Sequence, residues 1–348
     1  MQKVKLGTSH FDVTRLCLGT MTWGSSQNTQ EDGFAQMDAA LDYGINFFDT
    51  AELYAVPPTA ETCGKTEEII GNWFAARPGA RDKIVLASKI AGKGLPWIRE
   101  GAPISAGTLR EALEGNLRRL QTDRIDLYQL HWPNRPYPHH QKHWAFEATA
   151  DAAQEKEDMA AIVREMGELM KEGKIGAWGL SNDTPWGLMT YCRLAGELGV
   201  AKPASVQNEY SLLYRLDEPN LSEAMTYENV AYLPYSALAM GILTGKYQNG
   251  ARPEGSRFHL AGNSTVHRIN DKSLAATEEY IKLAAEASMT PSQLALAFTL
   301  TRPFVTSTIL GATSMAQLTE DMKAGELTLS SDVLAEIERI RQAYQMAW

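Results

Sequence analysis

The chain has 348 residues, of which 44% are hydrophobic and 22% charged, and its formal net charge is −9. These proportions are typical of a soluble globular protein, and no run of about 18 apolar residues predicts a membrane span. The acidic balance, without a basic cluster, argues against nucleic acid as a partner, because neutralising phosphates requires concentrated positive charge. Three cysteines without CxxC spacing, and an N-terminus without the apolar core of a secretory signal, predict a cytoplasmic protein.

Eight short apolar runs are typical of strands that are buried on both faces, and helix-like segments lie between them. The runs end near Thr20, Asp49, Lys89, His131, Asn182, Asn208, Ser236 and Gly311. This alternation predicts an α/β fold, a (β/α)₈ TIM barrel formed by residues 1–348 as a single domain. A doubly wound sheet is the competing fold, but the first strand is not followed by the G-x-G-x-x-G that a dinucleotide site of that kind requires.

Several of the intervening helices carry start signals. The pairs Thr29 with Asp32 and Thr108 with Glu111 have capping-box spacing, and Pro291 follows Thr290 at an expected first helical position. Apolar residues recur at helical spacing over 109–120 and over 162–170, where Gly173 is the expected end of the second helix.

Three further segments do not fit this alternation of strands and helices. The first residues, 3–19, predict two short strands around a glycine-containing turn, a β-hairpin that plugs the bottom of the barrel. Residues 133–158 after the fourth strand and 247–271 after the seventh are too long for simple connections. Both follow the carboxyl ends of strands, where barrel enzymes place their sites, so we expect lid loops.

The most informative feature is the polar residue at the end of each strand. Five successive strands end in Asp49, Lys89, His131, Ser181 with Asn182, and Gln207 with Asn208. In a (β/α)₈ barrel these carboxyl ends converge on one mouth, and residues there are typically catalytic. The sequence therefore predicts a polar site at the mouth.

Asp49 and Lys89 come from adjacent strands and are expected to form an ion pair, with Tyr54 on the loop above them. A lysine ammonium near a phenol favours the phenolate, so Lys89 and Asp49 together are expected to lower the pKa of Tyr54 from about 10 and make it a usable general acid. His131 can orient a carbonyl oxygen. Each residue taken singly has a purely structural explanation, as a cap, a solvated charge or a structural histidine. Their combination predicts reduction of a carbonyl, with the hydride supplied by a cofactor.

The motifs LGTMTWG, GINFFDTAELY, ASK, LYQLHWP, GAWGLSN, SVQNEYSLL, YSALAMGILTGKY and ILGATSMAQLTEDM cover nearly the whole chain. Their combination resembles an aldo-keto reductase. The resemblance implies a (β/α)₈ barrel that reduces aldehydes and ketones with NADPH. It also implies a catalytic tetrad of Asp49, Tyr54, Lys89 and His131, in which Tyr54 is the proton donor.

The resemblance further implies the cofactor contacts. Ser181, Asn182 and Gln207 would hold the nicotinamide carboxamide, and Tyr235 would stack on its ring. The pyrophosphate would lie against Ser236, Leu238, Gly241, Lys246 and Arg257, with Thr20 and Met21 also in contact, and the adenosine end against Gly311, Thr313, Gln317 and Asp321. Many relatives place Arg or Lys where this chain has Thr313 and Ser314, so NADPH is expected and NADH is kept as an alternative.

Substrate contacts are expected from the aromatic residues Trp23, Trp132 and Trp144.

Two other functions are kept beside carbonyl reduction. The second hypothesis is a redox-sensing interaction protein with little turnover, because potassium-channel β-subunits share similar motifs. A metal-dependent barrel hydrolase is the third, resting on His139, His140 and His143 in the sequence HHQKH. No carboxylate accompanies these histidines at metal-like spacing, so no metal site is predicted. The expected partner is a small-molecule carbonyl substrate, and the sequence leaves open whether the chain forms oligomers.

Overall fold

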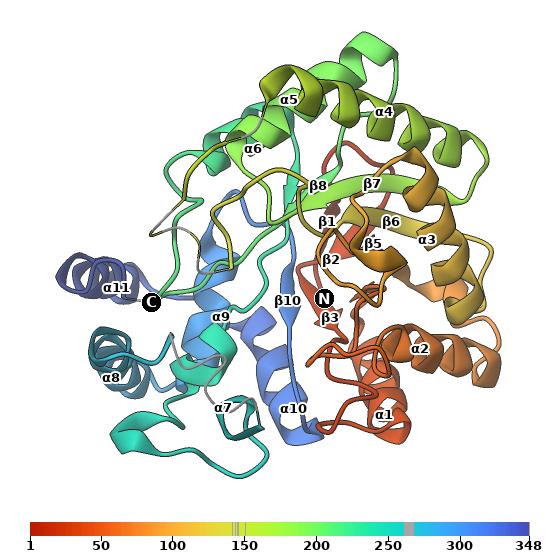
Figure 1. Ribbon diagram of the computed structural model, residues 1–348. Coiled ribbons are helices and arrows are strands. Elements are labelled where there is room, and N and C mark those ends of the chain that lie inside the picture. The colour runs from red at the N-terminus through yellow and green to blue at the C-terminus, as the bar shows by residue number, and fades with distance from the viewer. Residues whose placement is uncertain (141, 143, 145, 150, 261–267, 348) are drawn as a thin grey trace.

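The computed structural model describes residues 1–140, 142, 144, 146–149, 151–260 and 268–347. Its centre is a curled sheet of eight parallel strands, surrounded by helices that lie between successive strands (Figure 1). The strands are β3 (Leu16–Gly19), β4 (Phe47–Asp49), β5 (Val85–Ile90), β6 (Ile125–Leu130), β7 (Ile175–Ser181), β8 (Ser205–Gln207), β9 (Ala231–Tyr232) and β10 (Thr308–Leu310). They follow one another in chain order, with β10 beside β3. A bridge between Tyr232 and Val305, and a hydrogen bond from Ile309 N to Pro234 O (2.9 Å), join the last two strands, so the sheet closes as a (β/α)₈ barrel.

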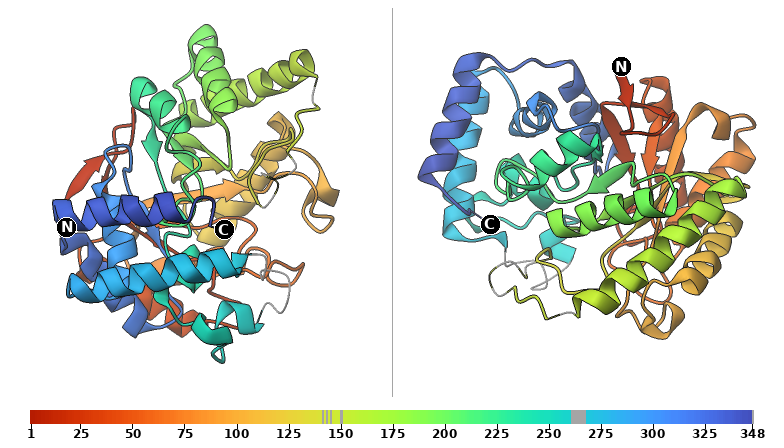
Figure 2. Two further views of the ribbon diagram at one scale, coloured as in Figure 1. Left: turned by 90° about the vertical axis from the view of Figure 1, so that its left-hand side faces the viewer. Right: turned by 90° about the horizontal axis from the view of Figure 1, so that it is seen from above.

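The helices form the outer layer, and the two further views show them on the outside of the barrel (Figure 2). They are α1 (Gln30–Asp42), α2 (Lys65–Ala76), α3 (Ala106–Leu120), α4 (Ala152–Lys171), α5 (Pro185–Leu198), α6 (Leu221–Glu228), α7 (Arg257–Leu260), α8 (Asp271–Glu286), α9 (Pro291–Thr301), α10 (Met315–Lys323) and α11 (Ser331–Ala343). Among the described residues, none of these helices has the length and apolarity that crossing a membrane would need.

The predicted hairpin is present at the N-terminus. Strands β1 (Lys3–Lys5) and β2 (Asp12–Thr14) pair antiparallel, and the turn between them packs against the amino ends of the barrel strands. Leu6 and Val13 are fully buried in one cluster with Phe47 and Leu127 from the barrel interior. Gly7 adopts φ +54°, and a Cβ there would lie 2.1 Å from Ala204 O, so only glycine permits this close approach. The hairpin therefore plugs the bottom of the barrel, as predicted.

Strand alternation explains why the polar residues gather inside the mouth. Successive side chains of a strand point to opposite faces, so residues two apart share a face. Phe47, Ala87 and Leu127 form the apolar interior layer, and two residues further along the same strands stand Asp49, Lys89 and Gln129. Pairing of Lys89 with Gln129 brings these residues level across β5 and β6. The interior thus changes from apolar to polar at one height.

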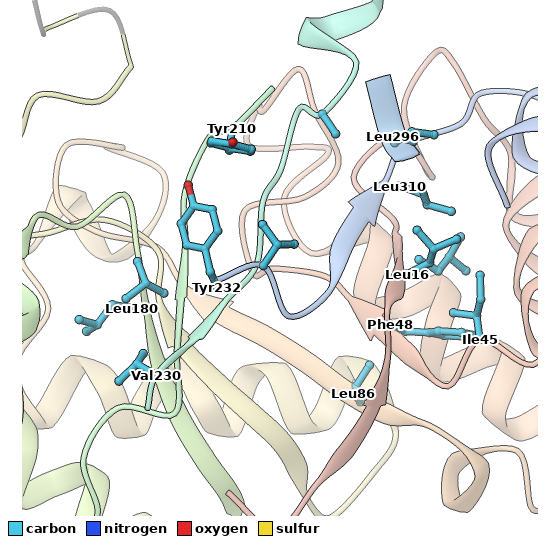
Figure 3. Packing of buried hydrophobic residues seen from close by; sticks show 14 of the residues in the cluster. Leu16, Ile45, Phe48, Leu86, Leu180, Tyr210, Val230, Tyr232, Leu296 and Leu310 are labelled. Atoms are coloured by element: carbon cyan, nitrogen blue, oxygen red, sulfur yellow. The ribbon is translucent and has the colours of Figure 1, made fainter. Parts of the chain in front are cut away.

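The outward-facing residues of the strands pack beneath the helices in the large core cluster. Figure 3 shows Leu16, Ile45 and Phe48 gathered beside one another in that cluster, and Tyr210 next to Tyr232. The last two rings meet edge to face with their centroids 6.0 Å apart. Because the strands are buried on both faces of the sheet, their sequences are continuous apolar runs.

The helix caps confirm two predictions and correct one. Thr29 caps α1 in a capping box with Asp32, and Thr290 caps α9 with Pro291 in its first turn. The predicted box of Thr108 with Glu111 is wrong: α3 begins one turn earlier, and Ser105 is its N-cap with Thr108 at the third helical position. Ser105 and Thr108 both have the side chain of an N-cap and lie three residues apart, so the sequence pattern alone does not distinguish them.

The two long segments contain more regular structure than expected. The first, 133–158, ends inside α4, which begins at Ala152, and the second, 247–271, contains α7. Both are held at the carboxyl end of the barrel. His139 Nε2 lies 3.3 Å from Asp183 O just beyond β7, and Arg268 donates to Glu209 Oε2 (2.6 Å) just beyond β8. Their described parts therefore lie on the side of the mouth, where lids were expected.

Candidate active site

A buried ion pair forms the floor of the mouth. Lys89 is fully buried, and its Nζ donates to Asp49 Oδ2 (2.6 Å) and to Thr50 O (2.8 Å). Burial lowers the pKa of Lys89, and Asp49, followed by Tyr54, raises it; the ring centroid of Tyr54 lies 5.0 Å from Nζ. An ammonium group has three N–H donors, so two protons of Lys89 have these acceptors and the third remains for the side of Tyr54. The predicted group of Asp49, Lys89 and Tyr54 is therefore assembled in space.

The second oxygen of Asp49 is held by two amides that complete the floor. Gln129 Nε2 lies 3.1 Å and Gln207 Nε2 lies 2.8 Å from Asp49 Oδ1. Gln207 Nε2 is also 3.2 Å from Gln129 Oε1. Each side chain comes from an alternate strand of the barrel, β4, β6 and β8. Three donors satisfy the carboxylate, and this compensates part of the cost of burying its charge.

The electrostatics of Tyr54 differ from the prediction. Burial raises the pKa of Tyr54 above its usual value, Lys89 opposes this shift, and the negative charge of Asp49 adds to it. The expectation that Lys89 and Asp49 together lower this pKa is thus corrected, because desolvation outweighs the ammonium and the carboxylate acts in the opposite sense. The phenol is protonated at neutral pH, and Lys89 lies where it stabilises the phenolate left after a proton is donated.

His131 lies beside Tyr54 in the mouth. The two rings meet edge to face with centroids 5.7 Å apart, and His131 is buried with its Nδ1 without a hydrogen-bond partner among the described residues. Burial, followed by the charge of Lys89, lowers the pKa of His131 well below 6.5. The imidazole is therefore neutral at physiological pH and offers a single N–H to a ligand.

Residues at the ends of β7 and β9 form a connected group next to this floor. Ser181 Oγ donates to Gln207 O (2.7 Å), and Asn182 Nδ2 lies 2.9 Å from His131 O and 3.2 Å from Ser181 Oγ. Tyr235 donates from its hydroxyl to Asn182 Oδ1 (2.6 Å). The polar residues assigned by resemblance to the nicotinamide are thus brought together within one hydrogen-bonded network.

Two cations line the adjoining part of the mouth. Lys246 and Arg257 are half-buried, and no carboxylate of the described residues lies within ion-pair distance of either side chain. Burial lowers the pKa of both side chains. Arg257 further lowers the pKa of Lys246, and Asp321 opposes that shift. Two half-buried cations without a counter-ion in the described part of the chain make this region attractive to an anion such as a phosphate.

The backbone beside these cations follows an unusual path. Ser236 has φ +53°, and φ is also positive at Ala239, Met240 and Gly241, within and just before the short 3₁₀ segment η4 (Ala239–Thr244). Leu238 precedes this segment. A Cβ on Gly241 would lie 3.0 Å from Lys246 Nζ, so the ammonium folds back over this turn.

Thr20 and Met21 directly follow β3. Thr20 Oγ1 donates to Asp49 O (2.9 Å), so this side chain supports the turn below the ion pair. Arg257 Nη2 lies 3.8 Å from Met21 Sδ. Met21 and Arg257 therefore meet across the mouth, although 236 residues separate them in the chain.

The motif at the adenosine end lies where β10 leads into α10. Gly311 is exposed, and no atom lies within 4 Å of the position that a Cβ would occupy. Gln317 Oε1 accepts from Thr313 N (2.9 Å) and Thr313 Oγ1 (3.1 Å). Asp321, two turns into the helix, is 3% exposed, and burial followed by the charge of Glu320 raises its pKa to about 8.

The three tryptophans have different environments. Trp132 is half-buried beside His131, with ring centroids 4.9 Å apart, and packs in a small apolar cluster with Leu53, Tyr54 and Ile98. Trp23 is fully buried in the core, where its Nε1 donates to Gln36 Oε1 (3.1 Å). Trp144 is 67% exposed. Only Trp132 therefore has the surroundings expected of a wall of the substrate site.

Sequence reasoning missed two residues of the mouth. Gln129 precedes His131 by two positions on β6, so strand alternation would have placed both on the same face. Tyr137, in the loop after β6, is 9% exposed and has no comparable sequence signal. Burial raises the pKa of Tyr235 well above 10, and the phenols of Tyr214, Tyr54 and Tyr137 add to that shift, so Tyr137 contributes to the electrostatics of the mouth.

The histidines considered for a metal have other surroundings. His139 Nε2 lies 3.3 Å from Asn208 Nδ2 in a buried network that includes Asp217, and His143 lies outside the described residues. In the part of the chain that the structure describes, no three His, Cys, Asp or Glu side chains converge as metal ligands.

The fold and the site together define a (β/α)₈ barrel with a tyrosine, a lysine and a carboxylate at the carboxyl ends of its strands. The model of the Aldo/keto reductase family matches residues 15–342. The chain is 42% identical over 350 residues to protein tas of Escherichia coli, with 99% of each chain covered. It is 32% identical to the uncharacterized oxidoreductase YrpG of Bacillus subtilis, and the alignment covers 98% of this chain and 96% of that protein. It is 30% identical to a probable voltage-gated potassium channel subunit beta of Arabidopsis thaliana, with 99% and 97% covered.

The chain belongs to the aldo/keto reductase family. It is an NAD(P)H-dependent oxidoreductase, as the family match and the oxidoreductase relative indicate.

Proposed function

We propose that the protein reduces aldehydes and ketones to alcohols with NADPH, and that Tyr54 is the proton donor. The observation that carries this proposal is the position of Lys89. Asp49 Oδ2 and Thr50 O accept two of its protons, and Nζ lies 5.0 Å from the ring centroid of Tyr54, which leaves the third proton for the phenol. A lysine fixed in this way has one role left, to stabilise charge on the tyrosine oxygen.

The residues of the mouth divide the chemistry among them. A bound NADPH supplies the hydride that adds to the carbonyl carbon. His131, neutral and beside Tyr54, donates its N–H to the carbonyl oxygen and orients it. Tyr54 transfers its proton to that oxygen as the alcohol forms, and Lys89 stabilises the phenolate until solvent returns a proton. Asp49 keeps Lys89 charged and in place.

Residues on both sides of the mouth fit the cofactor. Lys246 and Arg257 are cations without a counter-ion among the described residues, which suits a pyrophosphate, and Arg257 also influences the pKa of Tyr54. Thr313 and Ser314 offer hydroxyl groups at the start of α10, where a helix N-terminus favours a phosphate. These hydroxyls support NADPH as the preferred cofactor, and NADH is the alternative that the test below distinguishes.

The apolar surroundings of Tyr54 favour a carbonyl with an aromatic or bulky apolar group. Leu53, Ile98 and Trp132 pack in one apolar cluster with Tyr54. Such surfaces gain free energy when they cover an apolar ligand. We therefore assign Trp132 to the substrate site. We keep Trp23 as a core residue because its indole N–H already has a buried acceptor.

The test measures NADPH and NADH consumption with a reactive aromatic aldehyde in the native protein, in Tyr54→Phe and in Tyr227→Phe. Tyr227 is 84% exposed, so its variant controls for the loss of a tyrosine hydroxyl in general. We expect clear turnover that falls about 100-fold or more in Tyr54→Phe while cofactor affinity is kept, and no change in Tyr227→Phe. The ratio of the two rates in the native protein decides the cofactor preference.

A second function is favoured by the similarity to the probable potassium channel subunit beta of Arabidopsis thaliana. In that case the protein would bind NADPH as a redox-sensing partner of another protein and turn over slowly. NADPH binding in the absence of turnover with every carbonyl tried would favour this function, whereas rapid turnover contradicts it.

A further inference from the structure

The amide of Gln129 stands between the proton-donor group and the residue assigned to the nicotinamide. Gln129 is fully buried on β6, with Asp49 of β4 on one side and Gln207 of β8 on the other. Asp49 and Gln207 are 158 residues apart in the sequence. Gln129 contacts both, so it can hold the two halves of the mouth in one fixed arrangement.

The orientation of both amides follows from counting donors and acceptors. An ionised carboxylate only accepts hydrogen bonds, so Gln129 and Gln207 must each turn their NH₂ group toward Asp49 Oδ1. Gln129 then presents its oxygen to Gln207, which lies 3.2 Å from it with Nε2. Both protons of Gln207 Nε2 are therefore used, one by Asp49 and one by Gln129.

Only the carbonyl oxygen of Gln207 remains for a ligand. This residue can thus accept a hydrogen bond but has no proton to donate, which suits the NH₂ group of a carboxamide. If Gln129 were replaced by an apolar residue, Gln207 would lose one of its two acceptors and Asp49 one of its three donors. The amide of Gln207 would be free to rotate, and the carboxylate that holds Lys89 would be less well fixed.

We propose that Gln129 is a positioning residue that locks Gln207 as a pure acceptor and fixes the Asp49 carboxylate, and thereby couples cofactor binding to proton donation by Tyr54. This inference rests on the proposed reductase function. Gln129 acts through Asp49 and Gln207 and is not itself a donor of protons to the substrate.

The first test replaces Gln129 by Met, which keeps the size of the side chain and removes both hydrogen bonds. Misplaced catalytic groups reduce rates by up to about 100-fold, so we expect kcat to fall about 10- to 100-fold. The Kd for NADPH should rise severalfold. Gln36→Met is the matched control, because Gln36 is equally buried and also loses one hydrogen bond, to Trp23 Nε1. This control should lower Tm without changing kcat or the Kd for NADPH.

The second test, Gln129→Glu, provides a rescue that a merely structural role would not show. A protonated carboxyl has one O–H donor and one carbonyl acceptor, so it can reproduce both contacts of the amide. Once ionised it repels Asp49 and has no proton to donate. We therefore expect near-native kcat at low pH and a loss as the pH rises through the pKa of the introduced group, whereas Gln129→Met is impaired at every pH.

The outcomes separate this proposal from the proposed function. If Gln129→Met keeps native kcat, native Kd for NADPH and the native pH profile, the positioning role is wrong. Equal losses in Gln129→Met and Gln36→Met also overturn it, because they would reflect general destabilisation. If the native protein binds NADPH without turnover, the reductase function fails, and the Kd of Gln129→Met alone then decides the role: a native value overturns it, and a severalfold increase supports it.

Discussion

Lys89 and Asp49 form a fully buried ion pair at the floor of the mouth, with Nζ 2.6 Å from Oδ2. Removing one partner of such a pair leaves an unpaired buried charge and typically costs about 3–5 kcal/mol. We expect Lys89→Met to lower the free energy of unfolding by that amount and to reduce turnover about 100-fold or more, because the Tyr54 phenolate loses its stabilising charge. Chemical denaturation and steady-state kinetics check both effects.

The control for this prediction is Lys282→Met. Lys282 pairs with Glu279 on the surface, with 57% of its side chain exposed. A pair of this kind contributes at most about 1 kcal/mol, so stability and turnover should stay close to native. A loss of stability as large as that of Lys89→Met would mean that burial of the ion pair is not what makes it important.

The pH dependence of reduction should lack an acidic limb from His131. Burial and the charge of Lys89 hold the pKa of His131 well below 6.5, so the ring stays neutral as the pH falls through that value. The pKa of Tyr54 is raised by burial, and reduction needs the protonated phenol, so activity is lost only as the pH rises above about 10. We expect kcat to be flat from about pH 6 to 9. A limb near pH 6.5 that disappears in His131→Asn would contradict this assignment.

Asp321 should make the protein less stable as the pH rises. Its pKa is raised to about 8 in the folded protein and has an ordinary value in the unfolded chain, so the folded state binds the proton more tightly. Its contribution to stability is complete below the unfolded pKa and is lost as the pH rises through about 8. We therefore expect Asp321→Asn, which cannot ionise, to raise Tm at pH 8 by about 2 °C or more and to change it little at pH 4. Calorimetry at the two values tests this difference.

Lys246 should contribute to the affinity for NADPH. A hydrogen bond to a charged group is worth about 1.5–3 kcal/mol, so Lys246→Met is expected to raise the Kd for NADPH about tenfold or more. The affinity of the native protein should also weaken with salt, because screening reduces the attraction between the cation and the phosphates. Fluorescence titration measures both effects. Lys156→Met removes an exposed lysine of α4 and should leave the Kd unchanged.

The hairpin plug depends on the close approach at Gly7. Gly7→Ala would place a Cβ 2.1 Å from Ala204 O, so the hairpin would have to move away from the barrel. Gly79→Ala imposes a similar positive φ, but no atom lies within 4 Å of its Cβ position. We expect Gly79→Ala to cost about 1 kcal/mol from backbone strain alone and Gly7→Ala to cost clearly more. Equal costs would show that the hairpin packs loosely.

Much of the barrel could be predicted because its strands have a local signature. An apolar run that stops at Asp49, Lys89 or His131 marks both a strand and the end that points toward the mouth. The hairpin was predictable for the same reason, from two short runs around Gly7. The start of α3 was misjudged because Ser105 and Thr108 both satisfy the local rule for a cap, and only the packed helix shows which residue is used.

What the sequence by itself determined is the set of polar groups at the strand ends, since strand periodicity and the convergence of parallel strands are properties of the backbone. What only the tertiary structure decided is how those groups share their protons. The contact of Gln207 with Asp49, the burial that raises the pKa of Tyr54 and the core position of Trp23 all arise from packing between different elements of the fold. Hydrogen bonds and desolvation act over a few ångströms, so they depend on distances that no local pattern of residues contains.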